Sequence, residues 1–209
     1  MAPRTPEEKA EAEANRLAYE EARRAQHPGF IEAVIADAKV TADRRNEPHE
    51  FTSRLDIVVQ VAKLVLVSDA LIAQIFYRAK VALQVRGIPI LPRIMHRLAM
   101  MTAQVCIGDP VLVEPGVYFP HGQVVIDGMV NIGTGTSISP WVTVGLISGH
   151  YKGPTIGPEV RIGTGAKLLG PITVGYGARI GAGAVVLHDV PAGATVVGVP
   201  AVEIGERHL

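Results

Sequence analysis

The chain has 209 residues, enough for a sizeable core, and its twenty basic side chains balance twenty acidic ones. That charge balance argues against a nucleic-acid-binding protein and a polybasic membrane anchor. The sequence contains no run of about 18 apolar residues, so no membrane-spanning helix is predicted. The single cysteine, Cys106, excludes a disulfide framework and a cysteine-rich metal site, and the charged first residues do not form a signal peptide, so a cytoplasmic protein is expected.

The composition changes sharply near residue 106. Two glycines, Gly29 and Gly87, precede residue 107, and twenty follow it. We therefore predict an α+β protein with an α-helical domain over residues 1–105, a repeat domain over residues 106–204 and a short tail at 205–209.

The first half is predicted to form a series of helices. Residues 5–8 have the pattern of a helix start. The run that follows to Gln26 has few large apolar residues, so this helix is expected to be mostly solvated or to pack weakly on a partner. Further helices are predicted over residues 30–44, 53–66, 69–86 and 92–104. Within 69–86 the face expected to be buried carries Leu71, Ile72, Ile75, Phe76, Ala79, Ala82 and Leu83. Met100 and Met101 are expected to pack in the core.

The second half is built on a six-residue repeat. Large apolar residues recur at steps of six within three groups, which are Ile107, Val113 and Phe119; then Ile126, Ile132, Ile138 and Val144; then Ile156, Ile162, Leu168, Val174, Ile180 and Val186. A coil with three flat faces produces this period, whereas a helix or a simple alternating strand does not. Three repeats close one turn, so residue i is expected to stack on residue i+18 in the next coil.

The repeat is interrupted at two places, and both carry histidines. The step from Phe119 to Ile126 is seven, so one extra residue accompanies His121. Residues 146–155 do not fit the repeat and are predicted to form a polar, extruded loop with His150 and Lys152. A regular solenoid needs no interruption unless a side chain must project, so His121 is predicted to face a groove and act as a base. The alternative is that His121 is a plain residue of a surface turn.

Several segments together resemble the serine acetyltransferases of the hexapeptide acyltransferase family. They are residues 118–122, 124–126, 162–170, 178–186 and 198–201, together with 76–78 and 87–89 in the helical half, so the resemblance covers roughly residues 70–204. It implies a left-handed parallel β-helix. It also implies transfer of an acetyl group from acetyl-CoA to a hydroxyl, with L-serine as the acceptor, a reaction of cysteine biosynthesis.

The resemblance also assigns roles to residues. His121 would be the general base, and His150 and Lys152 would contact the acceptor. The family's Arg-His pair aligns with Lys152-Gly153, so His150 would stand in for it. Coenzyme A would contact Gly145, Thr164, Gly165, Ala182 and Arg179, the last through a phosphate. No metal is required, because a thioester is already activated. The family is a trimer with active sites between adjacent prisms, so a homotrimer, or a dimer of trimers joined by the helices, is expected.

The sequence departs from the family mainly on the acceptor side. The family's acidic partner of the histidine lies fifteen positions earlier, where this chain has Cys106. Asp109 or Glu114 would then have to supply the carboxylate. Pro120 replaces the acidic residue before the histidine, and Asp56 is out of step with the aspartate of the family's helical domain. The longer tail that docks onto cysteine synthase has no counterpart, so that partner is not expected.

Three other interpretations stay open. An acyltransferase for a sugar or another hydroxylated metabolite would share the donor side of the site. A trimeric scaffold that has lost its activity would explain the missing acidic partner. A zinc-dependent carbonic anhydrase on the same fold would need three converging histidines, which His121 and His150, far apart in the chain, do not supply.

Overall fold

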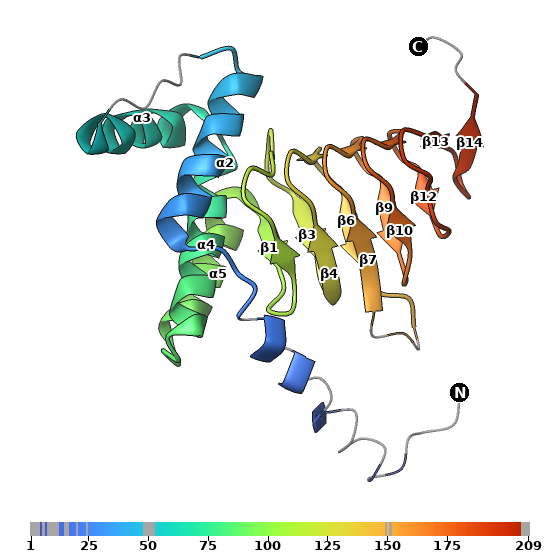
Figure 1. Cartoon of the computed structure of the whole chain (residues 1–209), viewed down its shortest axis with the longest axis horizontal. Coiled ribbons are helices and arrows are strands. Elements are labelled where there is room, and N and C mark those ends of the chain that lie inside the picture. Colours follow the sequence, from blue (N-terminus) through green and yellow to red (C-terminus); the bar gives the residue numbers. More distant parts are fainter. Residues whose placement is uncertain are drawn as a thin grey trace.

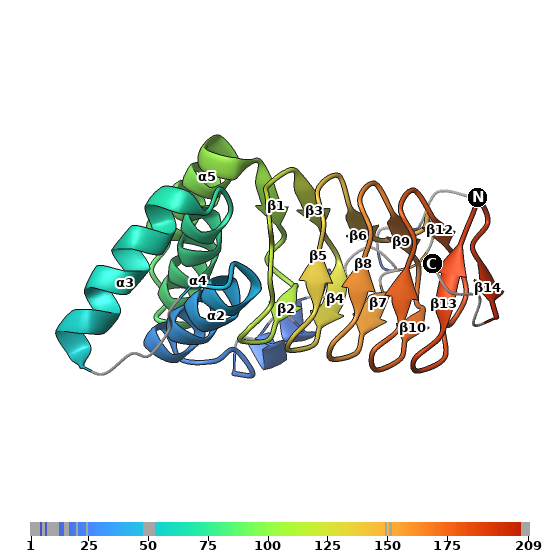
Figure 2. The ribbon, with the colours of Figure 1, turned by 90° about the horizontal axis from the view of Figure 1, so that it is seen from above.

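In the computed structural model, a group of helices packs on one end of a three-sided parallel β-helix (Figures 1 and 2). The structure describes residues 5, 7, 13–14, 17–19, 21–23, 25–47, 53–148, 150 and 152–205. Its helices are α2 (Phe30–Arg44), α3 (Arg54–Val67), α4 (Leu71–Val85) and α5 (Leu91–Ala103), each within two residues of the predicted bounds. None of the described helices is long and apolar enough to cross a membrane.

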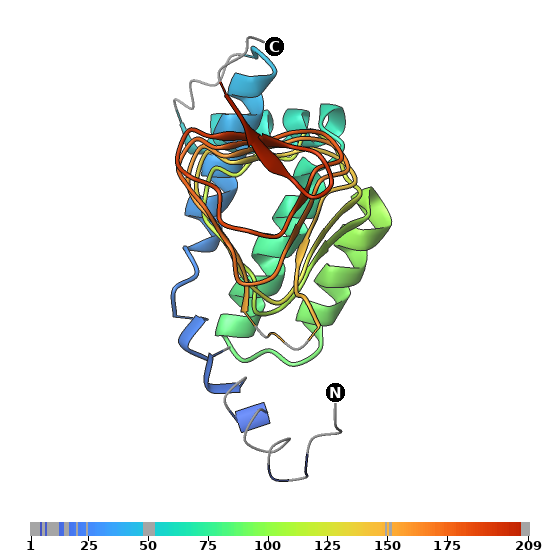
Figure 3. The same ribbon diagram turned by 90° about the vertical axis from the view of Figure 1, so that its right-hand side faces the viewer.

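The strands form three sheets, which are the three sides seen along the axis in Figure 3. The first sheet contains β1 (Val105–Ile107), β3 (Val124–Ile126), β6 (Thr143–Gly145), β9 (Lys167–Leu169) and β12 (Val185–Val186). The second contains β2 (Leu112–Val113), β4 (Met129–Ile132), β7 (Lys152–Ile156) and β10 (Thr173–Val174). The third contains β5 (Ser137–Ile138), β8 (Arg161–Ile162), β11 (Arg179–Ile180), β13 (Thr195–Val197) and β14 (Val202–Ile204). The pairings between these strands are parallel except that of β13 with β14.

The six-residue repeat correctly predicts the core of the β-helix. Every large apolar residue of the three groups is at most 3% exposed. The predicted offset of eighteen is found where the coils are regular, as between Arg161 and Arg179. It is nineteen across the turn with His121, where Cys106 pairs with Val125, so the extra residue is accommodated in that turn.

The second interruption is shorter than predicted. Residues 152–156 form β7, which pairs with β4 on one side and β10 on the other, instead of belonging to an extruded loop. The second interruption adds six residues, because Thr143 pairs with Lys167, twenty-four residues on. One of the six lies within β7, where Met129 pairs with Lys152 but Asn131 pairs with Thr155, and the others belong to the inserted segment before Lys152. Lys152 therefore lies in a sheet rather than in the loop.

The buried face of α4 is more polar than the predicted apolar stripe, although Leu71 of that stripe is fully buried. The most buried side chains of α4 include Gln74, Tyr77, Arg78 and Lys80, which are mostly polar, while the predicted stripe is largely half-buried. Their donors reach carbonyl oxygens of the first coil: Gln74 that of Val117, Tyr77 that of Val111, Arg78 those of Val113 and Glu114, and Lys80 that of Ile107. The first coil has no preceding coil to pair with, so α4 satisfies carbonyls that would otherwise be buried without a partner.

The helices are tied to the β-helix by a buried ion pair as well. Arg78 donates two hydrogen bonds to the carboxylate of Asp37 on α2, and Asp37 also accepts from the N–H of Gly116. Upstream of α2, part of the predicted first helix lies outside the described residues. Most of its described residues are exposed, while Arg23 is buried and donates to Asn131 on β4. The described part is therefore mostly solvated and packs on the β-helix at one end, as predicted.

Candidate active site

One edge of the prism gathers half of the predicted site residues, including the predicted base. At this edge, which we call the active-site edge, the chain passes from the third sheet to the first through the turns at residues 120–123, 139–141, 163–165 and 181–183. The first of these turns has four residues where the later ones have three. His121, Thr164, Gly165 and Ala182 all lie on this edge, so the structure places the predicted base in line with predicted donor contacts.

The turn that carries His121 is fixed to the end of α5. The N–H of Gln123 donates to the carbonyl of Ala103, with nitrogen and oxygen 2.9 Å apart. Gly122 approaches the same carbonyl so closely that a Cβ atom there would lie 1.6 Å from the oxygen. A glycine is therefore required beside His121, and the helical domain sets the position of the imidazole.

His121 has an acidic partner that the sequence analysis did not identify. Its Nδ1 lies 2.7 Å from Oδ2 of Asp69, in the turn between α3 and α4. An ionised carboxylate only accepts hydrogen bonds, so Nδ1 carries the proton and Nε2 of the neutral ring keeps a free lone pair. The two side chains are 61% and 71% exposed. This arrangement provides an oriented base at the surface of a groove.

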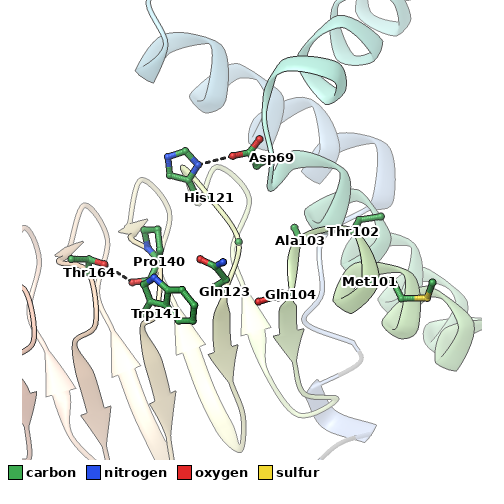
Figure 4. Close-up of a pocket in the computed structure, with 11 residues that line it drawn as sticks. Asp69, Met101, Thr102, Ala103, Gln104, His121, Gln123, Pro140, Trp141 and Thr164 are labelled. Atoms are coloured by element: carbon green, nitrogen blue, oxygen red, sulfur yellow. Dashed lines mark hydrogen bonds and ion pairs between the residues drawn. The ribbon is translucent and has the colours of Figure 1, made fainter.

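Figure 4 shows the cavity around this pair, which has a volume of about 490 Å³. The helical side supplies Asp69, Met101 and Thr102, and neighbouring coils of the β-helix supply Gln123, Pro140, Trp141 and Thr164 along the active-site edge. Met101 is 79% exposed, so the expectation that it packs in the core is wrong. Polar and apolar groups thus face one open space beside His121.

The carboxylates expected to support His121 are engaged elsewhere. Asp109 pairs with the buried ammonium of Lys80, and Glu114 accepts a hydrogen bond from the N–H of Thr134. Cys106 lines a separate groove with Lys80 and Asp109, and burial raises the pKa of its thiol. The proposals for Asp109 and Glu114 are therefore wrong, and the acid comes from the helical domain.

Three predicted residues lie at a different edge. Gly145 ends β6, His150 lies in the inserted segment and Lys152 begins β7, so all three are where the chain passes from the first sheet to the second. This is the opposite end of the first-sheet strands from His121. Within one chain, neither His150 nor Lys152 lines the cavity beside His121.

Arg179 lies on the outer face of the third sheet in a groove of about 790 Å³. Arg161 on β8 is its direct partner in register, and Arg44 from α2 also lines this groove. The groove contains Ser139, Gly163 and Gly181, which directly precede Pro140, Thr164 and Ala182 on the active-site edge. No aspartate or glutamate is among the described residues that line it. Two arginines opposite each other repel, so this groove favours an anion.

Two cavity residues were missed for different reasons. Asp69 was visible only as a charged residue at the start of the helix predicted over residues 69–86, and nothing in its spacing connects it with His121. Trp141 occupies the turn position that glycine takes in the next two coils, at Gly165 and Gly183, so it was visible as a departure from the repeat. Among the described residues, no group of three or more histidine, cysteine or acidic side chains is arranged to hold a metal ion.

Comparison with known proteins agrees with this architecture. No family model matches the chain. A serine acetyltransferase from Synechocystis is 42% identical over 142 residues, 65% of this chain and 57% of that protein. One from Helicobacter pylori is 38% identical over 146 residues, 68% of this chain and 85% of that protein.

Solved structures give the same result. Neisseria gonorrhoeae serine acetyltransferase in complex with serine superposes with a TM-score of 0.69 at 29% identity, over 82% of this chain and 68% of that one. The Brucella abortus enzyme in complex with coenzyme A gives 0.72 at 26% identity, over 90% and 72%. The prediction of an α+β protein with a left-handed parallel β-helix is confirmed. The chain therefore belongs to the serine acetyltransferase family.

Proposed function

We propose that this protein is an acetyl-CoA-dependent O-acetyltransferase, with L-serine as its acceptor and His121 as its general base. The observation that carries the proposal is the 2.7 Å contact between Nδ1 of His121 and Asp69 in a cavity that also contains Thr164. The relatives named serine acetyltransferase, and the solved structures with serine and with coenzyme A, support the choice of substrates.

The chemistry follows from the orientation of the imidazole. Nε2 of His121 accepts the proton of the acceptor hydroxyl while that oxygen attacks the carbonyl carbon of the thioester. A C–O bond forms, the C–S bond breaks, and the coenzyme A thiolate leaves with the proton that Nε2 returns. Such a base contributes about 10²–10⁴-fold, and holding both substrates in one groove contributes further.

The donor is proposed to lie along the active-site edge. Its thioester would reach His121, its pantetheine arm would pass the turns with Thr164, Gly165 and Ala182, and its phosphates would bind in the groove of Arg161 and Arg179. The adjacency of this groove to the same turns supports that path. The paired guanidinium groups offer planar, bidentate contacts to phosphate oxygens.

The acceptor contacts of His150 and Lys152 require a second copy of the chain. Because both residues lie at the far end of the first sheet from His121, we propose a homotrimer in which the segment at 146–152 of one copy reaches the active-site edge of the next. Helix α3 exposes Leu55, Val58 and Leu66, and we propose that this face joins two trimers. The single thiol fits a reducing compartment, and we propose the cytoplasm.

Release of free thiol from acetyl-CoA tests the function directly. We expect turnover with L-serine, and a panel of sugars and other hydroxylated metabolites distinguishes the same chemistry on another acceptor. His121→Ala should lower kcat by about 10²–10⁴-fold without changing the mass of the oligomer measured by light scattering. Full activity of His121→Ala would exclude the mechanism, and no thiol release with any acceptor would favour an inactive scaffold.

A further inference from the structure

Trp141 has no part in the mechanism above, although it lines the cavity beside His121. It is the only tryptophan of the chain, and it is 58% exposed. Its backbone has a φ of 65°, in the left-handed region that bulky residues rarely adopt. A large aromatic side chain held in this conformation at the wall of a cavity calls for an explanation other than packing.

The neighbouring coils show that the fold does not need an indole at this position. The equivalent turn residues are Gln104, Gln123, Gly165 and Gly183, and all have φ between 54° and 72°. The next two coils therefore use glycine, which adopts this conformation without strain. The backbone of Trp141 is fixed without its side chain, because its N–H donates to Gln123 O at 2.8 Å and its carbonyl accepts from Lys167 Nζ at 2.8 Å.

The place of Trp141 along the edge indicates which substrate it meets. Asp69 and Thr102 lie on the helical side of His121, whereas Trp141 and Thr164 lie on successive coils on its other side (Figure 4). The arginine groove begins beside those same turns, at Ser139 and Gly163. Trp141 thus shares a cavity with the base, and its turn borders the groove that favours an anion.

We propose that Trp141 is a binding residue for the pantetheine arm of the acyl donor. Its indole packs against the apolar part of the arm next to the thioester and keeps water from that side of the reacting carbonyl. This proposal rests on the proposed function, since it assigns a contact to the coenzyme A thioester. It adds a donor contact at a position where the next two coils have glycine.

Intrinsic fluorescence tests the contact, because all tryptophan emission comes from Trp141. Coenzyme A, which cannot react, is titrated into the wild-type protein, and its affinity is measured in parallel by calorimetry. We expect the emission to change with saturation at the calorimetric dissociation constant, and to stay constant on titration with L-serine. Calorimetric binding of coenzyme A with no change in emission would overturn the proposal.

Variants separate binding from structure. Trp141→Gly should weaken coenzyme A binding by about tenfold, because losing contact with a few tens of Å² of indole at about 25 cal/mol per Å² corresponds to that factor. Its melting temperature should be unchanged or higher, since glycine relieves the backbone. Trp141→Phe should stay within about threefold of wild type. Tyr176→Ala is the matched control, because Tyr176 is a similarly exposed aromatic residue at 62% in another turn.

The outcomes distinguish this proposal from the function on which it rests. Unchanged coenzyme A affinity in Trp141→Gly, or a higher KM for the acceptor with an unchanged affinity for the donor, would overturn the role of Trp141 alone. Absence of calorimetric binding of coenzyme A to the wild-type protein would overturn the proposed function and this contact together.

Discussion

Replacing Asp69 by asparagine tests whether the helical domain supplies the acidic partner of the base. Asp69→Asn keeps the shape of the side chain but removes its charge. An amide can present either its oxygen or its NH₂ group to Nδ1, so the tautomer with a free Nε2 is no longer imposed on His121. We expect kcat to fall by about 10- to 100-fold with little change in KM, because the loss cannot exceed the 10²–10⁴-fold that the base itself contributes.

Stability should hardly change in the same variant. Both side chains are more than half exposed, and an exposed contact of this kind contributes about 0–1 kcal/mol to the free energy of unfolding. Asp109→Asn is the matched control, since its carboxylate is 62% exposed but pairs with Lys80, which is buried. It should leave kcat unchanged and lower stability by about 1–2 kcal/mol, because the ammonium loses its charged partner.

Steady-state kinetics and urea denaturation on both variants give the comparison. Asp69→Asn combined with His121→Ala should be no slower than His121→Ala alone, since Asp69 acts only through the imidazole. Asp69→Glu should recover part of the rate. A normal kcat in Asp69→Asn, or a loss of rate that simply follows a loss of stability, would refute the assignment.

Two further predictions concern the frame of the site. Gly122→Ala should lower kcat by at least tenfold and the free energy of unfolding by about 2–4 kcal/mol, because the new Cβ would lie 1.6 Å from the carbonyl oxygen of Ala103. Unchanged activity and an unchanged urea midpoint would contradict this prediction. Burial lowers the pKa of His27 to about 4, so between pH 6.5 and 4 the unfolded chain binds this proton while the folded protein does not, and stability falls as the pH falls. The control is His27→Gln, and urea denaturation of both proteins at several pH values gives the comparison. Over this range the free energy of unfolding of the wild type should fall by about 1–2 kcal/mol more than that of the variant, because His27 is only partly buried. Superimposable pH profiles would show that His27 is not the group responsible.

The repeat predicted the β-helix in detail because its period and its packing have the same cause. An inward residue at every sixth position follows from the geometry of a flat side and a turn, so residues such as Ile132 and Ile162 are placed by local rules alone. The projection of His121 was predictable for the same reason, since one extra residue in a turn must displace its neighbours. The inserted segment was predicted too long because Gly153-Pro154 at the start of β7 has the composition of a loop.

The buried polar side chains of α4 were missed because hydrophobic periodicity assumes an apolar partner surface. The end of a solenoid is instead a layer of unpaired backbone carbonyls, which favours donors such as Gln74, Arg78 and Lys80. A sequence pattern gives no sign of that requirement unless the solenoid is already known to begin just after the helix. Polar residues outside the apolar stripe are therefore the ones that attach the two halves.

That attachment bears on the neutral Cys106, which stands where the family resemblance placed the acidic partner of the histidine. The carboxylate beside His121 comes from the turn between α3 and α4, and α4 is fixed to the first coil by the buried pair of Arg78 and Asp37 and by side-chain hydrogen bonds to its carbonyls. The distance between Asp69 and the imidazole is thus set by the docking of the helical domain and not by the coil that carries the histidine. With the acid supplied from this rigid contact, the coil is free to carry the neutral Cys106. It follows that perturbing the Arg78–Asp37 pair should impair the proposed catalysis from a distance, through the position of Asp69.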